Sequence, residues 1–298
     1  MVLRRLVTTL AVIAMSLTVS AHSEQKTENC IPENDLYIPS YIEGQGVTKA
    51  EFNEVIDRVE SIYAPIIERL GGELIVKRLW ENGTVNASAN RVDNKYIVNM
   101  YGGLARHRVM TKDGLALVIC HELGHHLGGA PKIGTRWATN EGQADYFSGL
   151  KCMRKVFAQE DNTRIVGQMD VDPVAERECQ KTFKGTQNIA ICMRSAMAGY
   201  TAAMMFRDLR KEQRMPSFDT PDTTRVEKTY HGHPATQCRM DTYLAGDICG
   251  ADANIDVSDR DLNVGVCSRK HGEERGARPL CWYSEDNPAG AILRLAKR

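Results

Sequence analysis

Hydrophobic residues in the first third of the chain follow two different spacings. From Ala50 to Leu70 they recur every three or four positions, as in an amphipathic helix, and two glycines follow. Apolar residues then gather in two short runs typical of strands, Glu73 to Trp80 and Lys95 to Met100. The segment from Asn82 to Asn94 is rich in turn residues and is expected to connect them. This pattern predicts a helix followed by part of a sheet.

A more uniformly apolar helix is predicted near the middle of the chain. Thr111 or Asp113 can cap it, and Gly128 marks its end. Further helical patterns extend from about Thr139 to Phe157 and from about Asn188 to Lys211. The polar stretch between these two patterns is expected to be irregular. Helices combined with a small mixed sheet predict an α+β fold.

The N-terminus has the pattern of a secretory signal. Arg4 and Arg5 precede an apolar run of 14 residues, and small residues around Ala21 suit a cleavage site. The run is shorter than the roughly 20 residues of a spanning helix. An uncleaved anchor or a twin-arginine export signal are the alternatives. We therefore expect residues 1–21 to be removed, the protein to reach a periplasm or the cell exterior, and no later stretch to span a membrane.

Composition and charge narrow the classes of partner. The 298 residues carry 38 Lys and Arg against 38 Asp and Glu, with 42% hydrophobic and 26% charged residues. These values are ordinary for a globular protein. A chain without an excess of positive charge has no field to neutralise a phosphate backbone, so nucleic acid is not the expected partner.

The nine cysteines indicate an oxidising compartment and hence disulfides. None lies closer than 11 positions to the next, which excludes a C-x-x-C redox centre. The odd number leaves one unpaired within the chain, and Cys120 is the candidate because it lies inside the apolar helix. Two clusters are expected, one of three cysteines and one near the C-terminus: Cys152, Cys179 and Cys192, then Cys238, Cys249, Cys267 and Cys281. The residues after about 247 are expected to form a small disulfide-held extension without a large core.

The apolar helix contains the sequence H-E-x-x-H. His121 and His125 lie four positions apart, so both imidazoles can reach one metal ion from the same face of a helix. Glu122 then lies beside the metal without binding it. Zinc held in this way activates water, and an adjacent carboxylate takes its proton. The sequence predicts hydrolytic chemistry, against the alternative of two helical histidines packed near a glutamate.

A catalytic zinc usually takes a third protein ligand, and Glu141 is the candidate. It opens the next helical pattern one short loop after His125. Asp145, four positions later on the same face, can accept a hydrogen bond from a ligand imidazole and fix its tautomer. Both acids also suit a helix N-terminus for electrostatic reasons alone. His126 is expected to point away from the metal, about 100° round the helix from His125.

A segment that begins at His231 reads H-G-H-P-A-T-Q-C-R and is the third motif in a series. With H-E-x-x-H and E-x-x-x-D, it resembles the gluzincin metallopeptidases, in particular the HtpX-like and CaaX prenyl protease family. The resemblance implies a zincin-like fold and a zinc cofactor. It also implies that His233 and Arg239 line the cleft and stabilise the oxyanion, as donors aimed at a developing negative charge do. A surface histidine and a structural arginine are the alternative.

The same resemblance extends upstream to N-A-S-A, which begins at Asn86. In the family an N-A-x-A segment forms a sheet edge that pairs with the substrate backbone. Asn86 and Ala87 are therefore implied substrate contacts, although small residues in a turn would look alike. One departure is the connection of only 15 residues between His125 and Glu141, which is more similar to thermolysin-type gluzincins.

These features together predict an exported zinc endopeptidase that acts on protein or peptide substrates. The signal peptide over 1–21 and an extended lead-in over 22–48 precede a peptidase domain over 49–246 and an extension over 247–298. One alternative is a non-catalytic, zinc-stabilised protein that binds a peptide in its cleft. Another is a latent peptidase whose lead-in or tail covers the cleft. The sequence predicts no oligomeric state.

Overall fold

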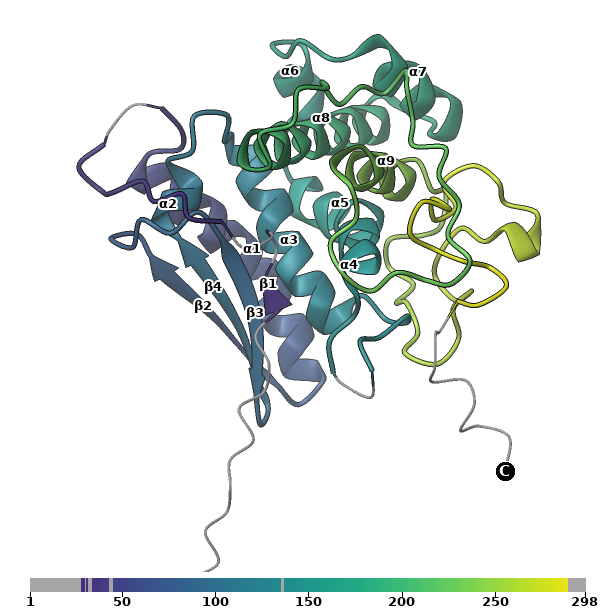
Figure 1. Cartoon of the computed structure of the whole chain (residues 1–298), viewed down its shortest axis with the longest axis horizontal. Helices are drawn as coiled ribbons and strands as arrows, with labels where there is room; N and C mark the ends of the chain where they lie inside the picture. Colours follow the sequence, from purple (N-terminus) through teal and green to yellow (C-terminus); the bar gives the residue numbers. More distant parts are fainter. Residues whose placement is uncertain (1–27, 30, 32–33, 43–44, 135–136, 289–298) are drawn as a thin grey trace, which may run out of the picture.

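The computed structural model describes residues 28–29, 31, 34–42, 45–134 and 137–288. A small mixed sheet lies on one side of the molecule and most of the helices lie on the other (Figure 1). The expected α+β class is confirmed. The expected signal peptide over 1–21 lies outside the described residues.

The first helix, α1, spans Lys49–Arg69, within one residue of the predicted range. A reciprocal cap fixes its start, since the Thr48 hydroxyl accepts from the Glu51 amide while the Glu51 carboxylate accepts from the Thr48 amide. The buried face consists of residues three and four positions apart: Phe52, Val55, Ile56, Val59, Tyr63 and Ile67. This face packs against β2 of the sheet and against the central helix α3 (Lys112–Leu127).

The sheet contains three longer strands and one short strand in the order β1-β3-β4-β2. β2 (Glu73–Leu79) and β4 (Lys95–Tyr101) correspond to the two apolar runs predicted as strands, and the structure pairs them in parallel. β3 (Ala87–Val92) pairs antiparallel with β4, and β1 (Glu28–Asn29) pairs antiparallel with β3. The lead-in thus supplies an edge strand.

β3 corrects the expectation of a turn-rich connection between Asn82 and Asn94. Two of its alanines, Ala87 and Ala89, are fully buried although small side chains give little hydrophobic signal. The opposite face carries a polar contact instead, in which the Asn99 amide donates to Ser88 Oγ at 2.9 Å. A strand made of small and polar residues therefore shows no apolar alternation from which it could be predicted.

The central helix α3 is capped by Thr111, whose hydroxyl accepts from the Gly114 amide at 3.0 Å. Thirteen of its residues are buried, so the helix is enclosed on nearly all sides. It packs against α1, α4 (Glu141–Phe147) and α8 (Thr186–Leu209), with the short helix α2 (Gly102–Ala105) before it. This position at the centre of the fold gives the H-E-x-x-H segment a rigid support.

The helical pattern predicted from Thr139 to Phe157 forms three consecutive pieces. α4 continues into a π-helical turn over Ser148–Cys152 and then into α5 (Met153–Phe157). The polar stretch that follows is not irregular as expected, because it contains α6 (Asn162–Val166) and α7 (Pro173–Thr182). Asp172 explains α7, since its carboxylate caps the helix immediately before a proline at the first helical position.

α8 is long and apolar enough to cross a membrane by length and composition, contrary to the expectation that no later stretch would be. Of its most apolar window, 72% is buried inside the protein, as in a core helix. α9 (Thr236–Asp247) packs against α8 and α4 and was not predicted. A short 3-10 helix over Arg269–His271 follows in the C-terminal extension.

Four disulfides join the eight described cysteines, and they change the expected pairing. Cys120 is not unpaired, because it bonds with Cys152 across α3 and the π-helical turn. The prediction was wrong because burial of Cys120 in an apolar helix does not show that Cys152 lies next to it on a neighbouring helix. The other three bonds are Cys179–Cys192, Cys238–Cys281 and Cys249–Cys267. The remaining cysteine, Cys30, lies outside the described residues.

The C-terminal extension is disulfide-held as expected, but it also contributes to the interior. Trp282 is fully buried and covers the start of α4. A Cβ atom at Gly142 would lie 2.2 Å from the Trp282 ring, so the close approach requires glycine there. The extension therefore packs onto the helix that begins with Glu141.

Candidate metal centre

Two histidines on α3 turn their rings toward a common point inside the protein. His121 and His125 lie one helical turn apart, and their ring centroids are separated by 4.7 Å at an interplanar angle of 88°. Both side chains are fully buried. The 3.6-residue repeat explains this placement, because side chains four positions apart share one face.

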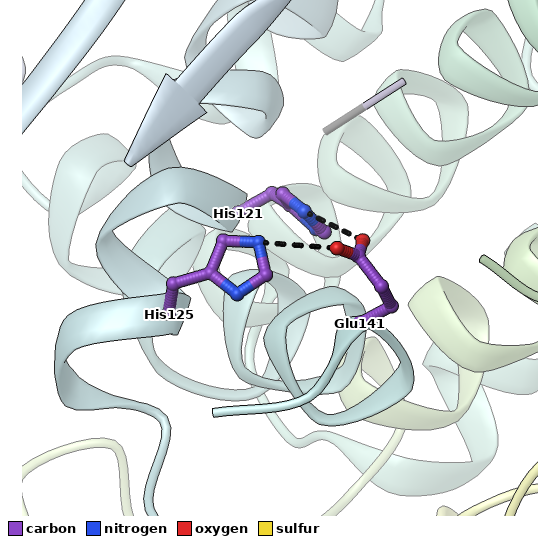
Figure 2. A group of neighbouring side chains, drawn as sticks. All are labelled: His121, His125 and Glu141. Carbon is purple, nitrogen blue, oxygen red and sulfur yellow. Dashed lines mark ion pairs between the residues drawn. The ribbon is translucent and has the colours of Figure 1, made fainter. Parts of the chain in front are cut away.

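Glu141, the first residue of α4, faces the two rings (Figure 2). Its Oε2 atom lies 3.3 Å from His121 Nε2, and its Oε1 atom lies 3.6 Å from His125 Nε2. The three ligand atoms lie within 4.8 Å of one another. The structure thus brings the expected third ligand to the two histidines, in a group that could hold a metal ion.

Close packing of α3 on α4 makes this convergence possible. A Cβ atom at Gly124 would lie 2.9 Å from the Ala144 backbone, so a larger residue would push the two helices apart. Asn140 caps α4 by accepting from the Gln143 amide at 3.0 Å. The Gln143 side chain in turn donates to the Gly128 carbonyl at 2.8 Å, which ties the start of α4 to the end of α3. The short connection therefore holds Glu141 in place.

Hydrogen bonds orient both imidazole rings. His121 Nδ1 lies 2.7 Å from Asp145 Oδ1, and His125 Nδ1 lies 2.8 Å from the carbonyl oxygen of Thr139. A carbonyl only accepts, so Nδ1 of His125 carries the proton and its Nε2 presents a lone pair to the centre. Such partners behind the ligand rings are typical of protein metal sites.

The electrostatics of the group suit a divalent cation. Burial lowers the pKa of His125 to about 4, so its imidazole is neutral near pH 7. Burial alone would raise the pKa of Glu141, but the surrounding His125, His121 and His233 rings lower it. His125 Nε2 has no hydrogen-bond partner among the described residues although it is buried. Neutral imidazole and ionised carboxylate are the ligand forms that metal binding requires.

Glu122 is fully buried on α3 next to His121. One residue corresponds to a rotation of about 100° round the helix, so its carboxylate stands beside the face that carries the two histidines. It is not a member of the group of three potential ligands. Glu122 is thus a buried carboxylate adjacent in sequence to one of the potential ligands.

His233 also reaches this centre, from the loop before α9. Its Nε2 atom lies 3.5 Å from Glu141 Oε2, and its side chain remains 26% exposed. The side-chain amide of Asn140 donates through Nδ2 to the Tyr230 carbonyl at 3.1 Å, which fixes this loop to the N-terminus of α4. His233 therefore has access both to the ligand group and to solvent.

Arg239 does not line a cleft, contrary to the expectation. It is fully buried in α9, where its Nε donates to Asp145 Oδ2 at 2.8 Å and its Nη2 donates to Asp145 Oδ1 at 2.7 Å. Its guanidinium carbon also lies 4.0 Å from the Phe206 ring centroid. Burial alone would raise the pKa of Asp145, but Arg239 and His121 hold it well below its ordinary value. The arginine thus pairs with the carboxylate that contacts His121.

Asn86 and Ala87 lie on the sheet edge that was expected to be open to substrate. Ala87 is fully buried, and the Asn86 side chain contacts the lead-in, with Oδ1 accepting from the Ile31 amide at 3.2 Å. β1 pairs with the next residues of the same edge. The edge is therefore occupied by the chain itself in this structure.

One contact that orients a potential ligand could not be predicted from residue types. The Thr139 carbonyl that orients His125 is a backbone atom, for which no residue type gives a signal. His126 lies outside the ligand group as expected, with its ring stacked on Trp137 at 4.7 Å. A second group of potential ligands, Asp222 with Cys238 and Cys281, is excluded because these cysteines form a disulfide.

Comparisons with models of known protein families, with curated proteins and with solved structures found no match. The geometry of the centre is therefore the basis for assigning a function.

Proposed function

We propose that this protein is an exported, zinc-dependent endopeptidase that hydrolyses peptide bonds in protein or peptide substrates. The convergence of His121, His125 and Glu141 beside the buried Glu122 carries the proposal. Two imidazole nitrogens and one carboxylate form a ligand set typical of catalytic zinc, which leaves a position for water. The four disulfides support export, because such bonds persist in oxidising compartments.

In this proposal Glu122 is the general base. A bound zinc ion would supply Lewis acidity, which brings the pKa of a water molecule down to about 7. Glu122 takes the proton of the water that attacks the substrate carbonyl and delivers it to the leaving amine. Burial suits this role, because a carboxylate held away from bulk water is a stronger base.

His233 is proposed to stabilise the negative oxygen that develops on the substrate. Its partial exposure and its distance of 3.5 Å from Glu141 place a donor at the border between the ligand group and solvent. Arg239 has a different role from the one that the resemblance implies. It holds Asp145 ionised, and Asp145 orients the His121 ring, so both are positioning residues.

Substitution of the proposed base tests the function directly. Glu122→Gln should retain bound zinc but lower the rate of hydrolysis of a denatured, fluorescently labelled protein by about a hundredfold or more. The assay uses the mature chain with its disulfides intact, with and without a chelator, and metal content is measured in parallel. Glu68→Gln on the exposed side of α1 is the matched control and should change neither quantity.

Each outcome has a distinct meaning. Full activity in the Glu122→Gln variant would remove Glu122 from its assigned role. A zinc-loaded natural chain that hydrolyses no denatured protein, even after limited proteolysis, would contradict the peptidase. Zinc bound without hydrolysis would then favour the zinc-stabilised peptide-binding protein. Loss of zinc in Glu141→Ala would identify Glu141 as a ligand in either case.

A further inference from the structure

The lead-in runs antiparallel along the outer edge of β3 and of the residues before it. Glu28 pairs with Ala89, and Asn29 pairs with Ser88. The other edge of β3 is taken by β4. β1 therefore occupies the edge of β3 that would otherwise offer its backbone donors and acceptors to another chain.

The contact continues beyond β1 toward the start of the domain. Tyr37 forms a β-bridge with Thr84, and the Ile38 amide donates to the Gly83 carbonyl at 2.7 Å. The Arg106 guanidinium donates to the Ile38 carbonyl and anchors this end of the lead-in to the domain. The described residues at both ends of this part of the lead-in, 28–29 and 37–38, thus pair with the same edge of the sheet.

Ile31 is the anchor of the part nearest β1. Its side chain is fully buried in the main hydrophobic core, together with Val85 and Ala87. The Asn86 amide binds its backbone twice, with Oδ1 accepting from the Ile31 amide at 3.2 Å and Nδ2 donating to the Ile31 carbonyl at 3.3 Å. Asn86 thus makes to the lead-in the paired contacts that one strand makes to the next.

This covered edge lies at the level of the metal centre. β3 contacts α3, and His126 Nε2 lies 3.2 Å from the Ile97 carbonyl oxygen. Ile97 is paired with Asn90 in the sheet, one position from the residue that pairs with Glu28. The helical turn that carries His125 therefore lies against the part of the sheet that β1 covers.

We propose that Glu28, Asn29 and Ile31 occupy the sheet edge at which a substrate would pair, so that the chain is a latent peptidase. This inference rests on the proposed function. An extended peptide gains affinity at such an edge through main-chain hydrogen bonds and through pockets for its side chains. A segment of the same chain competes at a high effective concentration, because it is tethered. Release or removal of the segment opens the edge to an extended peptide.

Ile31→Asp in the mature full chain tests the proposal, because a carboxylate at this buried position drives the segment out of its pocket. Ile31→Ala is the milder variant and weakens the anchor without adding charge. We expect kcat/KM for a denatured protein to rise by about tenfold in Ile31→Ala and by more in Ile31→Asp. Leu36→Asp, at an exposed position of the same lead-in, is the matched control and should leave kcat/KM unchanged.

A peptide that copies residues 26–33 provides a second measurement on the Ile31→Asp chain. It carries the Cys30→Ser substitution, so that thiol binding to the metal cannot explain its effect. We expect competitive inhibition by this peptide, and none by a scrambled peptide of the same composition. Thermal unfolding curves and zinc content show whether each variant is folded and loaded.

The outcomes separate this inference from the function on which it rests. Equal activity of the natural chain and the Ile31 variants, with no inhibition by the peptide, overturns latency and leaves the peptidase intact. Folded, zinc-loaded Ile31 variants that hydrolyse nothing overturn the peptidase itself. Lower activity in folded Ile31→Ala than in the natural chain also overturns latency, because it makes the segment a support of the active form.

Discussion

Two buried aspartates on neighbouring helices differ in charge, since one carboxyl group is ionised near pH 7 and the other is neutral. Asp145 on α4 is fully buried and Asp247 at the end of α9 is 1% exposed. The pKa of Asp145 lies well below its ordinary value, because Arg239 and His121 outweigh the effect of burial. Burial raises the pKa of Asp247 to about 8, which Ser195 and Arg154 oppose only in part. Equal burial therefore gives an ionised carboxylate in one place and a neutral acid in the other.

The direction in which the nearest arginine donates explains the difference. Arg239 donates Nε and Nη2 to the two carboxylate oxygens of Asp145. Arg154 instead donates to carbonyl oxygens at the end of α9, including that of Asp247 at 2.9 Å and that of Gly246 at 3.2 Å. A helix C-terminus has unpaired carbonyls that attract a cation. Arg154 stabilises these carbonyls, and the Asp247 carboxyl group is left protonated.

The same contrast explains how Arg239 would support the candidate metal centre. An ionised Asp145 accepts a hydrogen bond from His121 Nδ1, so that His121 Nε2 has a lone pair for a metal. A protonated Asp145 carries an O–H donor and has less capacity to accept. Burial without Arg239 would favour the protonated form, as it does at Asp247. Arg239 therefore acts on the centre through the charge of Asp145.

The largest expected effect comes from removing Arg239. Arg239→Met leaves a buried carboxylate without its partner and should lower the free energy of unfolding by about 3–5 kcal/mol. Urea unfolding of the metal-free protein at pH 7 measures this change. Arg225→Met, at an exposed position, is the control and should be neutral. A loss below about 1 kcal/mol would mean that Asp145 becomes protonated at little cost, as at Asp247.

Much of the fold near the centre could be predicted from periodicity. The predicted limits of α1, β2, β4 and α3 agree with the structure within about three residues, because each has a clear apolar pattern or a cap. β3 and α9 could not be predicted in this way, since their buried positions hold small or polar residues such as Ala87, Ser88 and Thr242. The disulfide of Cys120 depends on a tertiary contact with Cys152 and gave no local signal.

The candidate site likewise contains residues whose positions follow from local spacing and residues whose positions depend on long-range contacts. Positions of His121, His125 and Asp145 follow from helical geometry and from spacings of four residues. The position of Arg239 does not, because its partner Asp145 lies 94 residues earlier and the contact forms only when α9 packs on α4. The occupied edge at Asn86 has the same origin, since Ile31 lies 55 residues away.

The second expected effect concerns pH and Asp247. Its pKa is about 8 in the folded protein and about 3.9 in an unfolded chain, so the folded state binds an extra proton between these values. The contribution of Asp247 to the free energy of unfolding is fully present below about pH 4. It falls by about 1.4 kcal/mol per pH unit as the pH rises toward 8. Asp247→Asn removes the titration.

Urea unfolding of the natural and Asp247→Asn chains at pH 5, 6 and 7 measures this slope as a difference between variants. The variant should gain about 3 kcal/mol relative to the natural chain between pH 5 and pH 7. Parallel stability curves would show that Asp247 is ionised in the folded protein. In that case Arg154 would stabilise the Asp247 carboxylate more strongly than its contacts with carbonyl oxygens suggest.

The smallest expected effect is on metal affinity. The same substitution at Asp247 serves as the control for the substitution at Asp145. Asp145→Asn removes the charge that orients His121 and should weaken zinc affinity by about 10- to 100-fold, measured by competition with a chelator. Asp247→Asn makes the same chemical change at a buried site whose described contacts do not include the ligands, so zinc affinity should be unchanged. Equal losses in both variants would trace the effect to general loosening of the fold. A loss confined to Asp145→Asn makes the ionised carboxylate behind His121 a determinant of metal affinity.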